Sequence, residues 1–119
     1  MTVSDEDQER IRFLMEYIRT HQRENADMDR LAALAHMSKS KLKYTFRAMT
    51  GMTVAEYRTQ ERLRCVCDLL TESDLTVEEV GAAIGFSSIS SFCRFFKEQL
   101  GQSPGNYRIR TRETAKNTC

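Results

Sequence analysis

Apolar residues occur at intervals of three and four positions along much of this sequence. Leu31, Leu34 and Ala35 follow this spacing, and Val80 and Ile84 repeat it later in the chain. Such spacing places apolar side chains on one face of an α-helix. The chain contains one proline and five glycines among 119 residues, so few positions interrupt helices. The pattern predicts an all-helical protein.

The second half of the chain repeats the pattern of the first. Residues 31–38 match residues 80–87 at an offset of 49, and after one extra residue the offset becomes 50. Apolar, small, glycine and tyrosine positions are all kept, which predicts a duplicated structural unit. The pairs at the offset of 50 are Leu42 with Phe92, Phe46 with Phe96, Gly51 with Gly101, Thr53 with Ser103, Tyr57 with Tyr107 and Arg58 with Arg108.

Each repeat begins with a short helix that has its own start signal. Asp27 or Asp29 can cap the first one, and Thr76 with Glu79 forms a capping box for its counterpart. His36 aligns with Gly85 beyond the helix end, and this pairing predicts a positive φ there.

A second helix follows in each repeat, after a serine cap and before a closing glycine. The expected ranges are about 39–50 and about 88–100. Two helices joined by a tight turn form a helix-turn-helix, whose second helix can enter the major groove of DNA. A plain bundle would use the same hairpin. The expected apolar faces are Leu42, Phe46 and Met49 in the first repeat and Phe92, Phe95, Phe96 and Leu100 in the second.

The outer faces of these second helices favour DNA binding over a solvated bundle. Their polar and basic side chains can bond to bases or phosphates, and an exposed isoleucine can contact the methyl group of thymine. The outer residues are Lys39, Ser40, Lys43, Tyr44 and Arg47 in the first repeat and Ile89, Ser90, Cys93, Arg94 and Lys97 in the second.

A segment without proline or glycine, residues 53–72, lies between the repeats and predicts one helix of about 20 residues, roughly 30 Å long. Successive major grooves on one face of DNA are about 34 Å apart. A rigid helix of this length could therefore hold two recognition helices one turn of DNA apart, and one chain could bind without a partner subunit.

Charge supports this interpretation locally. The net charge is +1, but residues 31–71 hold seven basic against three acidic residues, whereas residues 1–30 hold five against eight. The acidic start of the chain could contact RNA polymerase, although acidic residues also favour a helix N-terminus.

Other function classes find little support. No carboxylate pair, phosphate-binding loop, nucleophile motif or metal-ligand spacing occurs, so we expect no enzyme, no cofactor and no metal site. Oxidation of Cys93 could make a thiol sensor of the outer face. No stretch is long and apolar enough to span a membrane, and the first ten residues do not form a signal peptide, which predicts a cytoplasmic protein without a membrane partner.

One run of residues is more specific than a lone helix-turn-helix pattern. The run comprises Gly85-Phe86-Ser87, then Ser91-Phe92, Arg94, Phe96-Lys97, Gly101, Ser103-Pro104 and Tyr107-Arg108. It resembles the signature of the AraC family of bacterial transcription regulators, and the resemblance covers residues 27–108.

The resemblance implies an all-α fold of seven helices, in which two homeodomain-like helix-turn-helix subdomains are joined by a long linker helix. An extra N-terminal helix, about Glu6 to His21, would bury Ile11, Leu14 and Ile18. The expected divisions are residues 1–25 for the arm and first helix, 26–52 and 74–112 for the subdomains, 53–73 for the linker and 113–119 for a tail.

The resemblance also implies a function: a sequence-specific regulator, expected to activate transcription, that binds double-stranded DNA as a monomer and contacts RNA polymerase. The alternative is a helical protein-interaction module that no longer reads DNA. The chain would be either a stand-alone activator of the multiple-antibiotic-resistance type or the output domain of a longer protein with a sensing or dimerising domain.

Carried over by position, the family's site residues fall on the outer faces already described. Two positions depart from the family pattern: Gly81 and Val66 both stand where alanine is usual, and Gly81 should cost about 1 kcal/mol of helix propensity. Base contacts are expected from Ser40, Lys43, Tyr44, Ile89, Ser90, Cys93 and Arg94, and phosphate contacts from Lys39, Arg47, Ser87, Ser91, Lys97 and the backbone near Ser103.

Overall fold

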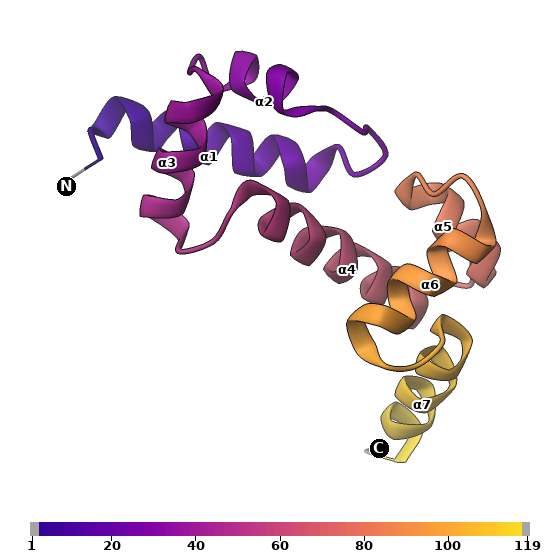
Figure 1. Ribbon diagram of the computed structural model, residues 1–119. Helices are drawn as coiled ribbons and strands as arrows, with labels where there is room; N and C mark the ends of the chain where they lie inside the picture. Colours follow the sequence, from indigo (N-terminus) through magenta and orange to yellow (C-terminus); the bar gives the residue numbers. More distant parts are fainter. Residues whose placement is uncertain (1–2, 118–119) are drawn as a thin grey trace. The chain divides into compact units, whose positions relative to one another are not determined.

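The computed structural model describes residues 3–117, with side chains up to residue 113, and within this range it contains seven α-helices and no strand (Figure 1). The all-α, seven-helix prediction is confirmed. The last helix continues beyond residue 112, into the segment expected as a tail, as far as the chain is described. The helices are α1 (Asp5–Thr20), α2 (Met28–Leu34), α3 (Lys39–Thr50), α4 (Val54–Glu72), α5 (Val77–Ile84), α6 (Ile89–Leu100) and α7 (Pro104–Asn117).

The chain forms two compact units, Met1–Glu61 and Arg62–Cys119, and the boundary lies inside α4. Each unit has its own hydrophobic core. The beginning of α4 contributes Val54 and Tyr57 to the first core, and its later turns contribute Val66 and Leu70 to the second. The linker segment is therefore part of both cores.

The core of the first unit is made by α1, α2, α3 and the start of α4. Phe46 of α3 meets the Tyr57 ring edge-on, with 5.5 Å between centroids. The Tyr57 hydroxyl donates to the Met15 carbonyl, and the Arg58 guanidinium donates to the Ala26 carbonyl (2.7 Å). Buried apolar residues from the helices ahead of α4 are Ile11, Leu14, Ile18, Leu31, Ala32, Ala35, Leu42 and Phe46.

The second unit repeats the aromatic pair and the donating arginine at the offset of 50, although the accepting carbonyl lies at a different position. Phe96 of α6 meets the Tyr107 ring edge-on at 5.4 Å, and the Arg108 guanidinium donates to the Leu70 carbonyl (2.9 Å). The matched interactions confirm that the sequence repeat is a structural one. One expectation fails: Leu100 is 37% exposed, because it is the last residue of α6 and the chain turns away at the left-handed Gly101.

The turn between the two short helices is built alike in both units. His36 has φ 55° and Gly85 has φ 104°, as their alignment predicts. The next backbone N–H closes the helix end by donating to a carbonyl five residues back, Met37 to Ala32 and Phe86 to Gly81, each at 3.0 Å. The extra residue of the second repeat lies in this turn.

Polar caps fix where each helix starts. The Ser38 and Ser88 hydroxyls each accept a hydrogen bond from the N–H three residues on, at 3.1 Å. Asp27, rather than Asp29, caps α2. Thr76 and Glu79 form the predicted capping box at α5, and the Thr76 N–H holds the pKa of the Glu79 carboxyl below its usual value.

Packing against Phe92, rather than helix propensity, explains why glycine occupies position 81. A Cβ atom placed on Gly81 would lie 2.9 Å from the ring of Phe92, closer than real Cβ atoms approach carbon. In the first repeat the matching pair is Ala32 and Leu42. The larger side chain on the second helix is thus accommodated by the smaller one on the first.

We expect Gly81→Ala to lower the free energy of unfolding by up to about 2 kcal/mol. Overpacking costs about 1–3 kcal/mol, and the better helix propensity of alanine returns about 1 kcal/mol. Urea denaturation followed by far-UV circular dichroism measures the change. Phe92→Leu should relieve the clash, so the double variant should lose less stability than the two single variants together.

Gly105→Ala is the matched control, because a Cβ atom there meets nothing within 4 Å and the residue also lies in a helix. We expect it to be neutral or stabilising. Equal effects of the two glycine substitutions would contradict the packing explanation.

Candidate nucleic-acid interface

The outer face of α3 lies opposite its buried residues. Leu42 and Phe46 are fully buried in the first core, and Ser38 fixes the first turn. The helix carries no acidic residue. All five residues predicted for this face are exposed: Lys39, Ser40, Lys43, Tyr44 and Arg47.

Two lysines of α3 already have acidic partners in the same unit. Lys39 Nζ lies 3.1 Å from a carboxylate oxygen of Asp29 in α2, and both side chains are exposed. Lys41 Nζ lies 3.3 Å from Asp7 of α1, whose side chain is only 16% exposed. Asp7 also contacts Arg10 at 3.5 Å. The partly shielded Asp7 pair ties α3 to α1, a role that no local sequence pattern indicated.

The other two cations of α3, Lys43 and Arg47, have no ion-pair partner among the described side chains. The charge of an exposed, unpaired lysine or arginine is available to a polyanion such as DNA. At ordinary salt concentrations, screening limits the range of this attraction to about 10 Å. The unpaired charge of α3 is therefore concentrated at these two residues, one turn apart.

The outer face of α6 has a different chemistry. Ile89 is 45% exposed, and Ser90, Arg94 and Lys97 are exposed as predicted. Cys93 is half-buried, so it is less accessible than expected for an outer-face residue. Neither Arg94 nor Lys97 has an ion-pair partner within the part of the chain that the structure describes.

Three serines expected to contact phosphate lie at helix starts. Ser87 and Ser91 are exposed, and the Ser88 hydroxyl donates to the Ser91 hydroxyl at 3.0 Å. Ser103 caps α7 by accepting from the Asn106 N–H at 3.1 Å. The Ser91 and Ser103 hydroxyls are thus partly used within the fold, and the N–H groups at the helix starts point along the helix axes.

A hollow of about 130 Å³ lies beside the start of α6. Ile89, Phe86, Ala82 and Gly81 supply apolar surface, and Glu78 brings a carboxylate. The hydroxyls come from Ser87 and Ser88.

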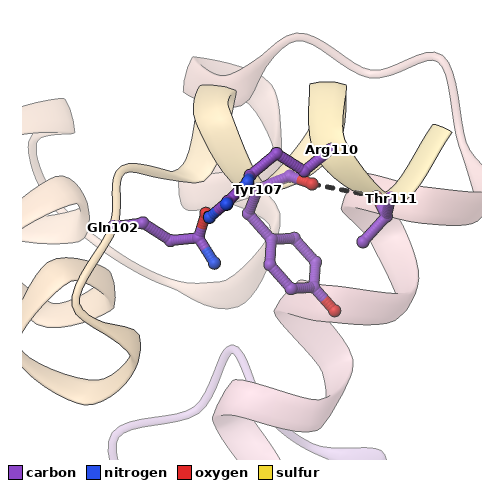
Figure 2. Close-up of a pocket in the computed structure, with 4 residues that line it drawn as sticks. All are labelled: Gln102, Tyr107, Arg110 and Thr111. Atoms are coloured by element: carbon purple, nitrogen blue, oxygen red, sulfur yellow. Dashed lines mark hydrogen bonds between the residues drawn. The ribbon is translucent and has the colours of Figure 1, made fainter. Parts of the chain in front are cut away.

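A second hollow, of about 320 Å³, lies at the beginning of α7 (Figure 2). Arg110 donates to the Gln102 side chain at 3.4 Å, and the Thr111 hydroxyl donates to the Tyr107 carbonyl at 2.9 Å. A hydrogen bond with Cys67 raises the pKa of the Tyr107 hydroxyl, and burial raises the pKa of the Cys67 thiol. A thiol kept protonated is a poor nucleophile, so this pair offers no reactive centre.

One family model covers most of this chain. Residues 31–110 match a family model described as a helix-turn-helix domain, and this range includes both hairpins and α4. The chain belongs to the AraC family. Within the described residues, no group of three metal-ligating side chains occurs and no helix is long and apolar enough to cross a bilayer.

Among AraC-family relatives, the MmsAB operon regulatory protein of Pseudomonas aeruginosa is 34% identical over 97 residues, which are 82% of this chain and 32% of that protein. The transcriptional activator RclR of Escherichia coli K12 is 33% identical over 88 residues, 74% of this chain and 31% of that protein. The chain thus spans about a third of the length of these curated relatives.

A solved structure of the AraC-type fold covers nearly the whole chain. The DNA-binding domain of AdpA, in complex with a target DNA, is 32% identical, with a TM-score of 0.76 over 93% of this chain and 96% of that one. This AraC-family chain therefore carries a DNA-binding domain of transcription regulators.

The ion pair between Lys39 and Asp29 generates a prediction. Asp29→Asn should release Lys39 for phosphate, so affinity for a mixed-sequence duplex should rise at low salt. The slope of log K against log salt should steepen by up to about 0.9, the value for one additional phosphate contact. Fluorescence anisotropy across a salt series measures both quantities.

Asp74→Asn is the control. Asp74 is fully exposed, and its ion-pair partner at 3.7 Å is Arg112 of α7, which belongs to neither α3 nor α6. This substitution removes the same charge. If both variants change the slope equally, general charge and not the Lys39 contact is responsible.

Proposed function

We propose that this chain binds a specific, asymmetric double-stranded DNA site as a monomer and activates transcription there, with α3 and α6 entering two successive major grooves. The observation that supports this proposal most directly is shared by both units. In each, the capped second helix packs against a buried aromatic core, and the outer face of that helix is exposed to solvent. The AdpA domain, similar in fold over nearly its whole length, was solved with its target DNA.

The outer-face residues divide by chemistry into those suited to bases and those suited to phosphates. Side chains in the N-terminal half of each second helix can reach base edges, while the flanking cations and the N–H groups at helix starts suit the phosphate backbone. We assign base contacts to Ser40, Lys43, Tyr44, Ile89, Ser90, Cys93 and Arg94, and phosphate contacts to Lys39, Arg47, Ser87, Ser91, Lys97 and the backbone near Ser103.

The length of α4 supports the use of two grooves. Nineteen helical residues span roughly 28 Å, which is comparable with the 34 Å between successive major grooves. Because one chain supplies two reading helices, the site needs no two-fold symmetry.

We propose that activation takes place through contact with RNA polymerase. The role also implies a cytoplasmic location, since the polymerase and the chromosome share that compartment in bacteria. The acidic first turn of α1 could contact the polymerase, although these acids also suit a helix N-terminus. No catalytic step is assigned to this domain. In a longer protein it would be the output domain, and sensing would be carried out elsewhere.

Variants of the two helices should separate base contacts from phosphate contacts. Lys43→Ala or Arg94→Ala should cost about 1–3 kcal/mol at a site selected from a random pool and should relax base preference at one position. Arg47→Ala or Lys97→Ala should weaken binding to all duplexes alike and reduce the salt slope by about 1. Equal losses on selected and random DNA for both pairs would contradict the assignment, and no affinity for mixed-sequence duplex even at low salt would indicate a protein-interaction module.

The stoichiometry and footprint test the arrangement on DNA. Sedimentation should show one chain per duplex, and hydroxyl-radical cleavage should show two protected segments about 10 base pairs apart. A single protected segment would show that only one unit engages DNA, and two chains per site would overturn monomeric binding.

A further inference from the structure

The second helices of the two units differ systematically on their outer faces. Both follow a serine cap, Ser38 or Ser88, so their residues correspond at an offset of 50. Three lysines of α3 are replaced by uncharged residues in α6, while Tyr44 is matched by the cation Arg94 and Arg47 by Lys97. The replaced pairs are Lys39 with Ile89, Lys41 with Ser91 and Lys43 with Cys93.

The first turn of α6 therefore has no charge with which to attract DNA. Its most exposed large side chain is Ile89, held at the first helical position by the Ser88 cap. Cys93 lies one turn further along the same face and is half-buried. Together they make a small apolar spot at the start of the helix, the end that contacts base edges in helix-turn-helix proteins.

The hollow beside Ile89 extends this apolar spot. Phe86 and Ala82 contribute to its lining, and Glu78 places a carboxylate there. An uncharged apolar group from DNA meets no repulsion from this carboxylate and can be buried against the apolar lining. In the major groove of duplex DNA, the apolar group presented by the bases is the C5-methyl of thymine.

We infer that Ile89 recognises the methyl group of one thymine in the target site. The inference rests on the proposed function and deepens it: the cations of both second helices supply charge-dependent affinity, and the first turn of α6 adds discrimination by apolar contact. Burial of one methyl group corresponds to about a fourfold change in Kd. This contact adds no phosphate neutralisation and therefore no salt dependence.

The test uses the full chain and a duplex selected by it from a random pool. Each thymine of that duplex is replaced in turn by deoxyuridine, which keeps the base pair and removes only the methyl group. At one thymine we expect Kd to rise about fourfold for the unaltered protein. Ile89→Ala should abolish this sensitivity, and Ile89→Val, which keeps branched methyl groups, should retain part of it.

Ile109→Ala is the matched control. Ile109 is 57% exposed, more than Ile89, but lies on α7. This variant should keep the deoxyuridine effect, and Ile89→Ala should keep the salt slope of the unaltered protein. Far-UV circular dichroism verifies that each variant is folded.

The outcomes separate this inference from the proposed function. If the chain binds its selected duplex but no thymine is sensitive, or Ile89→Ala remains sensitive, the methyl contact is wrong and DNA binding stands. If no duplex is selected or bound, the proposed function fails and the inference with it. A steep loss of salt dependence in Ile89→Ala would also overturn the inference, since the side chain carries no charge.

Discussion

The left-handed residue between the two helices of each hairpin, with the serine cap that follows it, determines the rest of this structure. His36 and Gly85 reverse the chain within a few residues, and Ser38 and Ser88 fix where the next helix begins. Once that start is fixed, the helical repeat decides which side chains face the core and which face solvent. Any surface for DNA on α3 or α6 therefore exists because of backbone geometry at residues that need not touch DNA.

Much of this architecture could be predicted because its signals are local. Caps, the paired His36 and Gly85, and the closing glycines each act within a few residues, and the helices begin and end close to the expected positions. The contact of Gly81 with Phe92 and the Lys41–Asp7 pair were missed, because each joins positions whose meeting depends on packing. Exposure of most outer-face residues also followed from the helical period, while their roles on DNA remain predictions.

The two units show how one fold can support two kinds of surface. Their inner contacts correspond closely: an aromatic pair and an arginine bound to a carbonyl recur at the same offset. Their outer faces share little beyond one cation and one serine. Coulomb attraction acts over about 10 Å and discriminates weakly, whereas apolar contact requires touching and depends on shape. Both second helices present cations, and α6 adds the exposed Ile89, so the chain can combine long-range attraction with short-range selectivity.

The two hairpins match side-chain sizes differently: Ala32 and Leu42 form the matching pair in one, and the smaller Gly81 packs with the larger Phe92 in the other. This difference limits how the two halves can be recombined. A hybrid hairpin joining α2 to a helix with the inner side of α6 would place a phenyl ring against a methyl group, and the reverse hybrid would leave a void. Whole hairpins, or outer side chains alone, could be transplanted without that conflict. An engineer seeking a new target preference in this scaffold should therefore rewrite the solvent side of a helix and leave its inward partners together.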